Sequence, residues 1–162
     1  MGWYDTSQVC LNGHVITDNA TSSPEFMQKY CSECGEPTII TCPECKTKIR
    51  GEYQVEGALT IRSSTPIAPL FCHECGKPYP WTLRKINAAK ELGDELDDLS
   101  VDEKKKLKSS LDDLIIDTPK TEIAIVRFKK LMSKVGKESY GAMKAIIIDI
   151  VSESVRKAIF GN

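Results

Sequence analysis

The sequence of 162 residues predicts a small β-rich module held by metal ions, followed by an α-helical C-terminal region of three to four helices. Two observations support it. All seven cysteines and five of the eight prolines lie between Cys10 and Cys75. Beyond Trp81 no proline occurs before Pro119, and apolar residues recur every three or four positions, as on one face of a helix. We therefore predict a double zinc-ribbon module over residues 1–81 and a helical domain over residues 82–162.

The first half is rich in turn residues and short apolar runs. Three of these runs are β-branched or aromatic enough to predict short strands. They cover residues 38–41, 53–55 and 58–61. Because elements this short cannot bury an adequate core, the module is expected to depend on its metal ions for folding.

The helical half opens with an apolar stripe, which predicts a first helix. The stripe consists of Leu83, Ile86, Ala89, Leu92, Leu96 and Leu99. Ser100 and Glu103 then match the capping box S-x-x-E, which predicts the start of a second helix. The apolar face of this second helix is expected at Leu107, Leu111, Leu114 and Ile115.

Thr118 followed by Pro119 predicts the N-cap and first position of a third helix. Gly136 is expected to stop that helix. Its buried stripe is expected at Ala124, Phe128, Leu131, Met132 and Val135. A last helix is predicted from about residue 139 to about residue 159 by its periodicity. Its apolar face would be Tyr140, Met143, Ile147, Ile150, Val151, Ser154 and Ala158.

Four closely spaced ligand pairs form a metal-binding pattern. One pair has the spacing C-x3-H and three have the spacing C-x2-C. Structural zinc is tetrahedral and takes four Cys or His ligands, so eight ligands fill two sites and leave no cysteine over. The sequence therefore predicts two Zn²⁺ per chain. The pairs are Cys10 with His14, Cys31 with Cys34, Cys42 with Cys45, and Cys72 with Cys75.

The ligand pairs can share ions in two ways. Sequential pairing joins the first pair to the second and the third to the fourth, whereas a cross-brace joins the first to the third and the second to the fourth. Sequential pairing closes loops of only 16 and 26 intervening residues. Because the entropic cost of closing such short loops is low, sequential pairing is favoured. Iron is an alternative metal for the all-cysteine site, because thiolates also suit iron.

Histidines and glycines near the cysteines have separate expected roles. The C-x3-H spacing of His14 is looser than C-x2-C, so the alternative is that water completes that site. His73 lies inside a ligand pair and is expected to be a solvent-facing turn residue. Gly35 and Gly76 follow the second cysteine of their pairs, and Gly13 precedes His14. Glycine at these places predicts left-handed turns whose N–H groups face the sulfurs.

Four segments around the ligands carry a family resemblance. They are Cys10-x-Asn12-Gly13-His14, Cys31-x2-Cys34-Gly35, Cys42-Pro43-x-Cys45 and Cys72-His73-x-Cys75-Gly76-Lys77-Pro78-Tyr79-Pro80-Trp81-Thr82. In these segments the chain resembles a family of uncharacterised bacterial double-zinc-ribbon proteins, a domain of unknown function. The resemblance covers the first half strongly and the helical tail weakly. It implies a bacterial cytoplasmic protein with ribbon-type sites at the eight ligand positions, and it implies no activity.

Bulk charge gives little indication of a partner. The net charge is −1, which provides no general attraction to nucleic acid. Only residues 119–162 are clearly basic, with 9 Lys/Arg against 4 Asp/Glu. Neither a secretory signal nor an apolar run long enough to span a bilayer is visible, so a cytoplasmic location is expected.

No catalytic pattern is visible in the sequence. His73 and Glu74 are followed by Cys75, which breaks the zinc-hydrolase motif H-E-x-x-H. The H-x-E and P-C-x-x-C motifs of zinc deaminases are both missing. Every cysteine is assigned to a metal site, which leaves no thiol nucleophile. We therefore expect a non-catalytic binding protein.

Three binding functions remain open at this point. A protein-interaction adaptor or scaffold is the first choice, acting through a protein partner or through self-association of the C-terminal helices. A nucleic-acid-binding zinc-ribbon regulator is the second, and an amphipathic helix over residues 141–160 acting at a membrane is the third. The second rests on basic residues beside one ligand pair and on others nearby: Lys46, Lys48, Arg50, Arg62, Lys77, Arg84 and Lys85.

Overall fold

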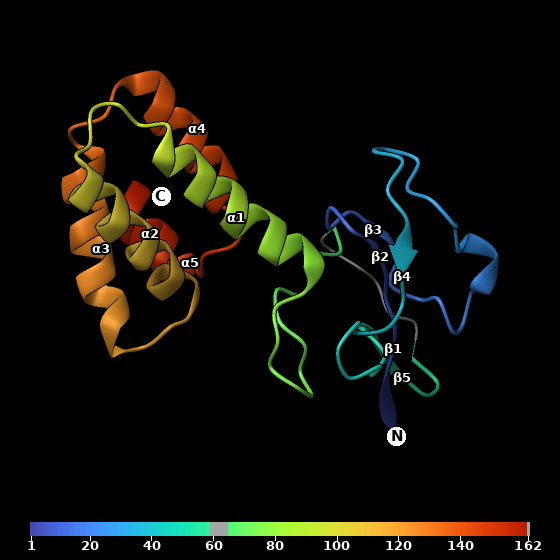
Figure 1. Cartoon of the computed structure of the whole chain (residues 1–162). Coiled ribbons are helices and arrows are strands. Elements are labelled where there is room, and N and C mark those ends of the chain that lie inside the picture. The colour runs from blue at the N-terminus through green and yellow to red at the C-terminus, as the bar shows by residue number, and fades with distance from the viewer. Residues whose placement is uncertain (59–64, 162) are drawn as a thin grey trace. The chain divides into compact units, whose positions relative to one another are not determined.

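A computed structural model describes residues 1–58 and 65–161 (Figure 1). The chain divides into two compact units, Met1–Leu83 and Arg84–Asn162. The first unit carries two small sheets, a short 3₁₀ helix η1 (Pro24–Phe26) and all seven cysteines. Four helices, and most of a fifth, lie in the second unit.

The first sheet pairs two segments that lie far apart in the sequence. Strand β1 (Gly2–Thr6) runs antiparallel to β5 (Arg50–Val55), with Tyr4 opposite Tyr53. The register shifts between Tyr4 and Thr6, as at a β-bulge. This pairing fastens the N-terminal strand to the segment that follows the third ligand pair.

The second sheet has the order β3-β2-β4, with both pairings antiparallel. Its central strand β2 (Gln8–Cys10) lies between β3 (Val15–Thr17) and β4 (Thr38–Ile39). The turn between β2 and β3 contains the C-x3-H pair, and the Cys10 N–H donates to the His14 carbonyl at 3.0 Å. The sheet therefore holds the first ligand pair in a hairpin.

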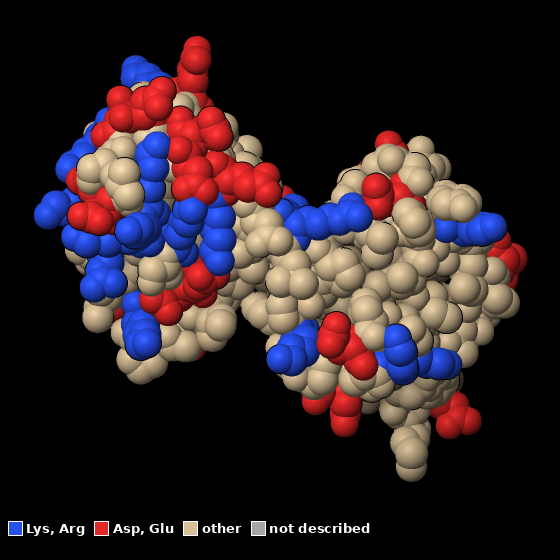
Figure 2. Space-filling view, viewed as in Figure 1, with Lys and Arg blue, Asp and Glu red and all other residues tan. Residues whose placement is uncertain are grey.

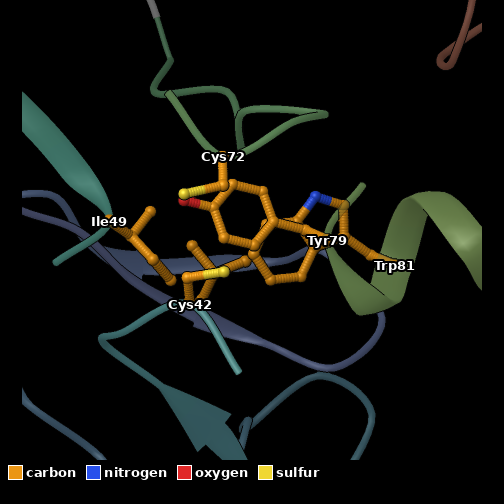
Figure 3. Close-up of a cluster of buried hydrophobic side chains, with 6 residues drawn as sticks. Cys42, Ile49, Cys72, Tyr79 and Trp81 are labelled. Atoms are coloured by element: carbon orange, nitrogen blue, oxygen red, sulfur yellow. The ribbon is translucent and has the colours of Figure 1, made fainter. Parts of the chain in front are cut away.

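A small core joins the second sheet to the cysteines (Figure 3). Its six buried residues are Val9, Cys42, Ile49, Cys72, Tyr79 and Trp81. The rings of Tyr79 and Trp81 stack with centroids 4.7 Å apart and planes at 15°. Because two of the six residues are cysteines from the third and fourth ligand pairs, packing and metal binding share the same side chains.

Of the predicted strands that the structure describes, one is confirmed in full and one in part. Strand β4 covers the start of the predicted run at 38–41, and β5 contains all of 53–55. The run at 58–61 lies outside the described residues except for Ala58. Strands β1, β2 and β3 were not predicted, since their short segments mix polar and apolar residues without clear alternation.

Helices α2 (Val101–Ile115) and α3 (Pro119–Met132) confirm both predicted capping patterns. The Ser100 hydroxyl accepts from the Glu103 N–H, and the Glu103 carboxylate accepts from the Ser100 N–H at 3.0 Å. Thr118 caps α3, with Pro119 at its first position. The predicted buried residues of α2 are all buried, and so are those of α3 apart from the half-buried Val135.

The first helix differs from its prediction at both ends. Helix α1 (Pro80–Asp94) starts before the apolar stripe, and Leu83 is exposed. It ends before Leu96 and Leu99, which are buried in the connection to α2. The two aspartates at positions 97 and 98 are poor helix formers, and they precede the cap of α2.

The predicted last helix is wrong as a single element, because the structure divides it in two. Helix α4 (Lys137–Ile147) is followed by a turn and then by α5 (Glu153–Phe160), which raises the helix count to five. Ser152 starts α5 by accepting from the Val155 N–H at 3.3 Å. The isoleucine and valine run before it is β-branched, which lowers helix propensity. Gly136 was also misassigned: α3 ends at Met132, and Gly136 is the N-cap of α4.

The second unit has its own apolar core, built from all five helices. Its members include Ala89, Leu107, Leu114, Phe128, Met143, Ile147, Ile150 and Val155. Residues 141–160, the segment of the membrane alternative, contribute Ile147, Ile150 and Ile159 to the buried residues of this unit. Among the described residues, no helix combines the length and the apolar character that crossing a membrane requires.

Candidate metal centres

The first cluster brings together Cys10, His14, Cys31 and Cys34. Each residue offers one ligand atom, and these four atoms all lie within 4.8 Å of one another. The His14 Nδ1 atom lies 3.5 Å from the Sγ atoms of both Cys10 and Cys31. The Cys10 and Cys34 sulfurs are 3.7 Å apart.

The second cluster contains Cys42, Cys45, Cys72 and Cys75, again with ligand atoms within 4.8 Å of one another. The Cys42 and Cys75 sulfurs are 3.8 Å apart, and those of Cys45 and Cys72 are 3.6 Å apart. The structure thus groups the ligand pairs sequentially, first with second and third with fourth, as loop closure favours.

These separations match the edges of a tetrahedral metal site. An ion about 2.3 Å from two sulfurs at the tetrahedral angle sets them about 3.8 Å apart, and a sulfur–nitrogen edge is about 3.5 Å. A disulfide would instead require about 2.05 Å between sulfurs. All seven cysteines are free thiols in the structure. Each cluster is therefore fit to hold one metal ion.

The three C-x2-C pairs share one local structure. In the second pair, the Cys31 N–H donates to the Glu36 carbonyl at 2.8 Å, and the Gly35 N–H donates to the Cys31 carbonyl at 2.9 Å. The Cys42 and Cys72 turns repeat both bonds at the same distances. A β-bridge flanks each turn, pairing Tyr30 with Pro37, Thr41 with Lys48, and Phe71 with Pro78. Two cysteine side chains thus project from each turn toward one point.

Positive backbone angles occur after the second cysteine of each turn. Gly35 has φ +75° and Gly76 has φ +69°, which confirms the left-handed turns predicted there. Lys46 occupies the equivalent place with φ 65°, and no other described non-glycine residue has positive φ. A residue with a side chain adopts this conformation at a cost of about 1–2 kcal/mol, whereas glycine adopts it readily.

This difference predicts opposite effects for two substitutions. We expect Gly76→Ala to lower the free energy of unfolding by about 1 kcal/mol through backbone strain, since no atom would crowd the added methyl group. We expect Lys46→Gly to leave that free energy unchanged or to raise it by up to about 1 kcal/mol. Denaturant unfolding of the metal-loaded chain measures both. An equal loss in the two variants would contradict the role assigned to the left-handed position.

His14 faces the first cluster through Nδ1, and its other ring nitrogen faces outward. The His14 Nε2 atom lies 3.7 Å from a carboxylate oxygen of Glu33, a residue inside the second ligand pair. Metal-binding imidazoles usually direct their second nitrogen at a carboxylate or carbonyl, which fixes the ring orientation. This geometry supports His14 as the fourth ligand rather than a water molecule.

The thiols of the second cluster influence one another's ionisation. The backbone N–H of Cys75, followed by other hydrogen bonds, lowers the pKa of Cys72 to about 6. The backbone N–H of Lys77 lowers the pKa of Cys75, but burial and the neighbouring thiols Cys45, Cys72 and Cys42 outweigh it and raise that pKa to about 12. Crowded thiolates repel, and a divalent cation at their centre stabilises all of them in the ionised form.

Tyr79 is the site residue that sequence analysis missed. The residue is 1% exposed, and its hydroxyl forms a hydrogen bond with the Cys72 side chain, with the oxygen beside the sulfur (Figure 3). Burial and this bond raise the pKa of Tyr79, so it stays a neutral donor. A hydrogen bond to a metal-binding sulfur orients the ligand and tunes its basicity. The available signal was an aromatic residue four positions after Cys75, in the segment that carries the family resemblance.

Both clusters have the number of ligands that a structural metal site takes. Each already offers four protein ligands, the full set for structural zinc. His73 is exposed and joins neither cluster, as predicted. Within the described ranges, 1–58 and 65–161, these two clusters are the only groups of three or more potential metal ligands.

Comparison with known proteins gives a family. No curated protein and no solved structure matches the chain. A family model described as "Uncharacterized protein conserved in bacteria (DUF2321)" matches residues 3–159, nearly the whole chain, including both clusters and all five helices except the last residue of α5. The chain therefore belongs to this uncharacterised bacterial family, DUF2321.

Proposed function

We propose that the eight clustered residues bind two structural zinc ions, and that the chain acts as a non-catalytic protein-interaction adaptor. The complete four-residue ligand sets support a structural role, because catalytic zinc keeps one coordination position open. The mixed nitrogen and sulfur ligands of the first cluster favour zinc over iron. For the all-cysteine cluster, iron is the alternative that elemental analysis decides.

One observation carries the adaptor role: large aromatic side chains are exposed on the β1–β5 sheet. Trp3, Tyr4 and Tyr53 are each about half exposed, at 50%, 53% and 49%. We call Tyr4, Tyr53 and Arg50 the aromatic surface. Trp3 precedes Tyr4 in the strand, so its side chain points to the opposite face of the sheet. The Arg50 guanidinium lies 4.8 Å from the centroid of the Tyr4 ring, and Tyr4 meets Tyr53 edge to face at 5.0 Å.

The composition of the aromatic surface is that of a binding surface. Tyr and Arg are among the residue types that dominate the energetics of protein interfaces. The Tyr4 ring contacts both the Tyr53 ring and the Arg50 guanidinium, which limits the side-chain entropy lost on binding. Gly2 leaves room for Tyr53, since a methyl group there would come within 2.0 Å of the tyrosine hydroxyl oxygen.

A single-stranded nucleic acid is the second candidate partner, and the Arg50–Tyr4 contact favours it. Bases stack on exposed aromatic rings, and cations beside the rings bind phosphate. The charge of the unit argues against it, because residues 1–83 hold 6 Lys/Arg and 9 Asp/Glu, a net −3. We therefore place a protein partner first.

The adaptor proposal is tested by photo-crosslinking in the native cells. A photoreactive phenylalanine analogue in place of Tyr53 is expected to capture a specific protein. Tyr4→Ala in the same chain should reduce the yield roughly tenfold, as the loss of about 1.4 kcal/mol of binding would. Ile67→Ala is the matched control, since Ile67 is 90% exposed in the same unit and lies outside the aromatic surface.

Two outcomes would overturn the protein-partner assignment. One is a crosslink whose yield is equal in the Tyr4→Ala and Ile67→Ala chains. The other is capture of nucleic acid, with salt-sensitive binding tighter than about 10⁻⁵ M at physiological salt. If Arg50→Glu abolished that binding, the nucleic-acid function would replace the adaptor function.

A further inference from the structure

A basic groove lies between α2 and α3 in the helical unit. Its cavity has a volume of about 470 Å³. Four exposed cationic side chains line it, Lys105 and Lys106 from α2 and Arg127 and Lys130 from α3. The buried Leu131 also lines it. We call these four cationic residues the basic groove.

The basic groove lacks internal charge partners. Elsewhere in the unit, lysines pair with nearby acids, as Lys85 does with Asp149 and Lys90 with Asp112. None of the four groove cations forms an ion pair in the part of the chain that the structure describes. The one acid at the groove, Glu103, is already bound to Lys134. Like charges held close together without counter-charges create a positive potential that an outside anion can satisfy.

The same unit carries a segment of opposite charge over residues 91–102. Six acidic residues occur in these twelve positions, and all are exposed. Asp94 pairs with Lys108, and Asp98 accepts from the Gly136 N–H at 3.4 Å. The remaining four, which we call the acidic segment, have no ion pair among the described residues: Glu91, Glu95, Asp97 and Asp102.

Acidic and basic side chains gather side by side on one face of the helical unit (Figure 2). Exposed apolar side chains lie near both charged groups in the sequence. Val101, beside Asp102 of the acidic segment, is 70% exposed, and Ile123 and Val126, on α3 before Arg127, are 52% and 66% exposed. A partner that fits this face carries charges of both signs and apolar contacts between them. The chain itself has this composition.

We propose that the helical unit binds a second copy of the chain, with the basic groove of each protomer against the acidic segment of the other. A two-fold axis makes this contact twice, because the same face then serves both protomers. An extended phosphate backbone fits less well, since the unit holds 16 Lys/Arg against 14 Asp/Glu and the acidic segment would repel it. The inference goes beyond the adaptor function and does not depend on the aromatic surface.

Contacts between exposed charges are individually weak and are screened by salt. We therefore expect a dimer of the metal-loaded full chain at low ionic strength that dissociates as salt approaches about 1 M, where charges are screened over about 3 Å. Analytical ultracentrifugation measures the dissociation constant. A monomer at every salt concentration would overturn the proposal.

Charge reversal gives the sharper test. Lys106→Glu with Arg127→Glu, and separately Glu95→Lys with Asp97→Lys, should each raise the dissociation constant roughly tenfold or more. Mixing the two variants should restore the dimer, since every reversed groove then meets a reversed segment. The control is Lys120→Glu with Lys137→Glu, the same charge change at exposed helix-start positions outside the groove.

The mixing experiment also separates specific pairing from damage to the fold. Circular dichroism on each variant checks that the helices remain. Rescue in the mixture supports the groove-to-segment contact. Disruption without rescue, or equal disruption by the control variant, would show that the charges act in some other way and would overturn the proposed pairing.

Discussion

Removal of the metal ions is expected to unfold the N-terminal unit while the helices of the C-terminal unit survive. Two of the six core residues of the N-terminal unit, Cys42 and Cys72, are proposed ligands, so losing the ions also disrupts packing. Structural zinc contributes on the order of 10–16 kcal/mol in small domains, comparable to the whole stability of a typical domain. The C-terminal unit has its own core, which contains no cysteine.

The chain offers separate spectroscopic signals for its two units. Both tryptophans, Trp3 and Trp81, lie in the N-terminal unit, and Trp81 is buried against Tyr79. Far-ultraviolet circular dichroism reports mainly the helices. A strong chelator should shift the tryptophan emission to that of exposed indole and leave most of the helical signal, and added zinc should reverse the shift. Loss of both signals in one step would show a single cooperative unit instead.

Loss of one ligand is expected to empty one site and to leave the other filled. Cys72→Ser should remove the ion from the second cluster only, and Cys31→Ser the ion from the first, because each cluster draws on its own four residues. A serine hydroxyl stays protonated at neutral pH and is a poor zinc ligand. Each variant should therefore bind one ion per chain, by elemental analysis of purified protein. Loss of both ions from either variant would contradict the independence of the two sites.

Tyr79 provides the matched control for Cys72. Tyr79→Phe removes only the hydroxyl that is bonded to the Cys72 side chain and keeps the ring that stacks on Trp81. We expect it to keep both ions and to weaken zinc affinity at the second cluster by roughly 10–100-fold, the usual effect of losing a partner of a metal ligand. An unchanged affinity in a chelator competition would show that the tyrosine serves packing alone.

Features encoded by neighbouring residues could be predicted from the sequence. The C-x2-C turns close within six residues, and the helix caps at Ser100 and Thr118 form between positions three apart or fewer. Turn and capping chemistry of this kind depends on residue type and spacing alone. The same local logic located the left-handed glycines Gly35 and Gly76.

Features that depend on distant contacts could not be predicted. The β1–β5 pairing joins Gly2 to Val55, and no local pattern specifies that register. The break between α4 and α5 is stabilised by burial of Ile150 and Val151 in the turn, which overrides a continuous helical period. The bond from Tyr79 to the Cys72 side chain exists only once the core has formed. Sequence spacing therefore located the cysteine clusters, and the structure was needed to find what surrounds them.

We propose that this member of the family holds two zinc ions in two independent four-ligand sites. The metal content of the purified full chain decides this, by elemental analysis and by native mass spectrometry under conditions that retain bound ions. We expect two zinc ions per chain and seven reduced cysteines after the metal is stripped under denaturing, non-oxidising conditions. One ion per chain, none, or intact disulfides in the isolated protein would contradict it.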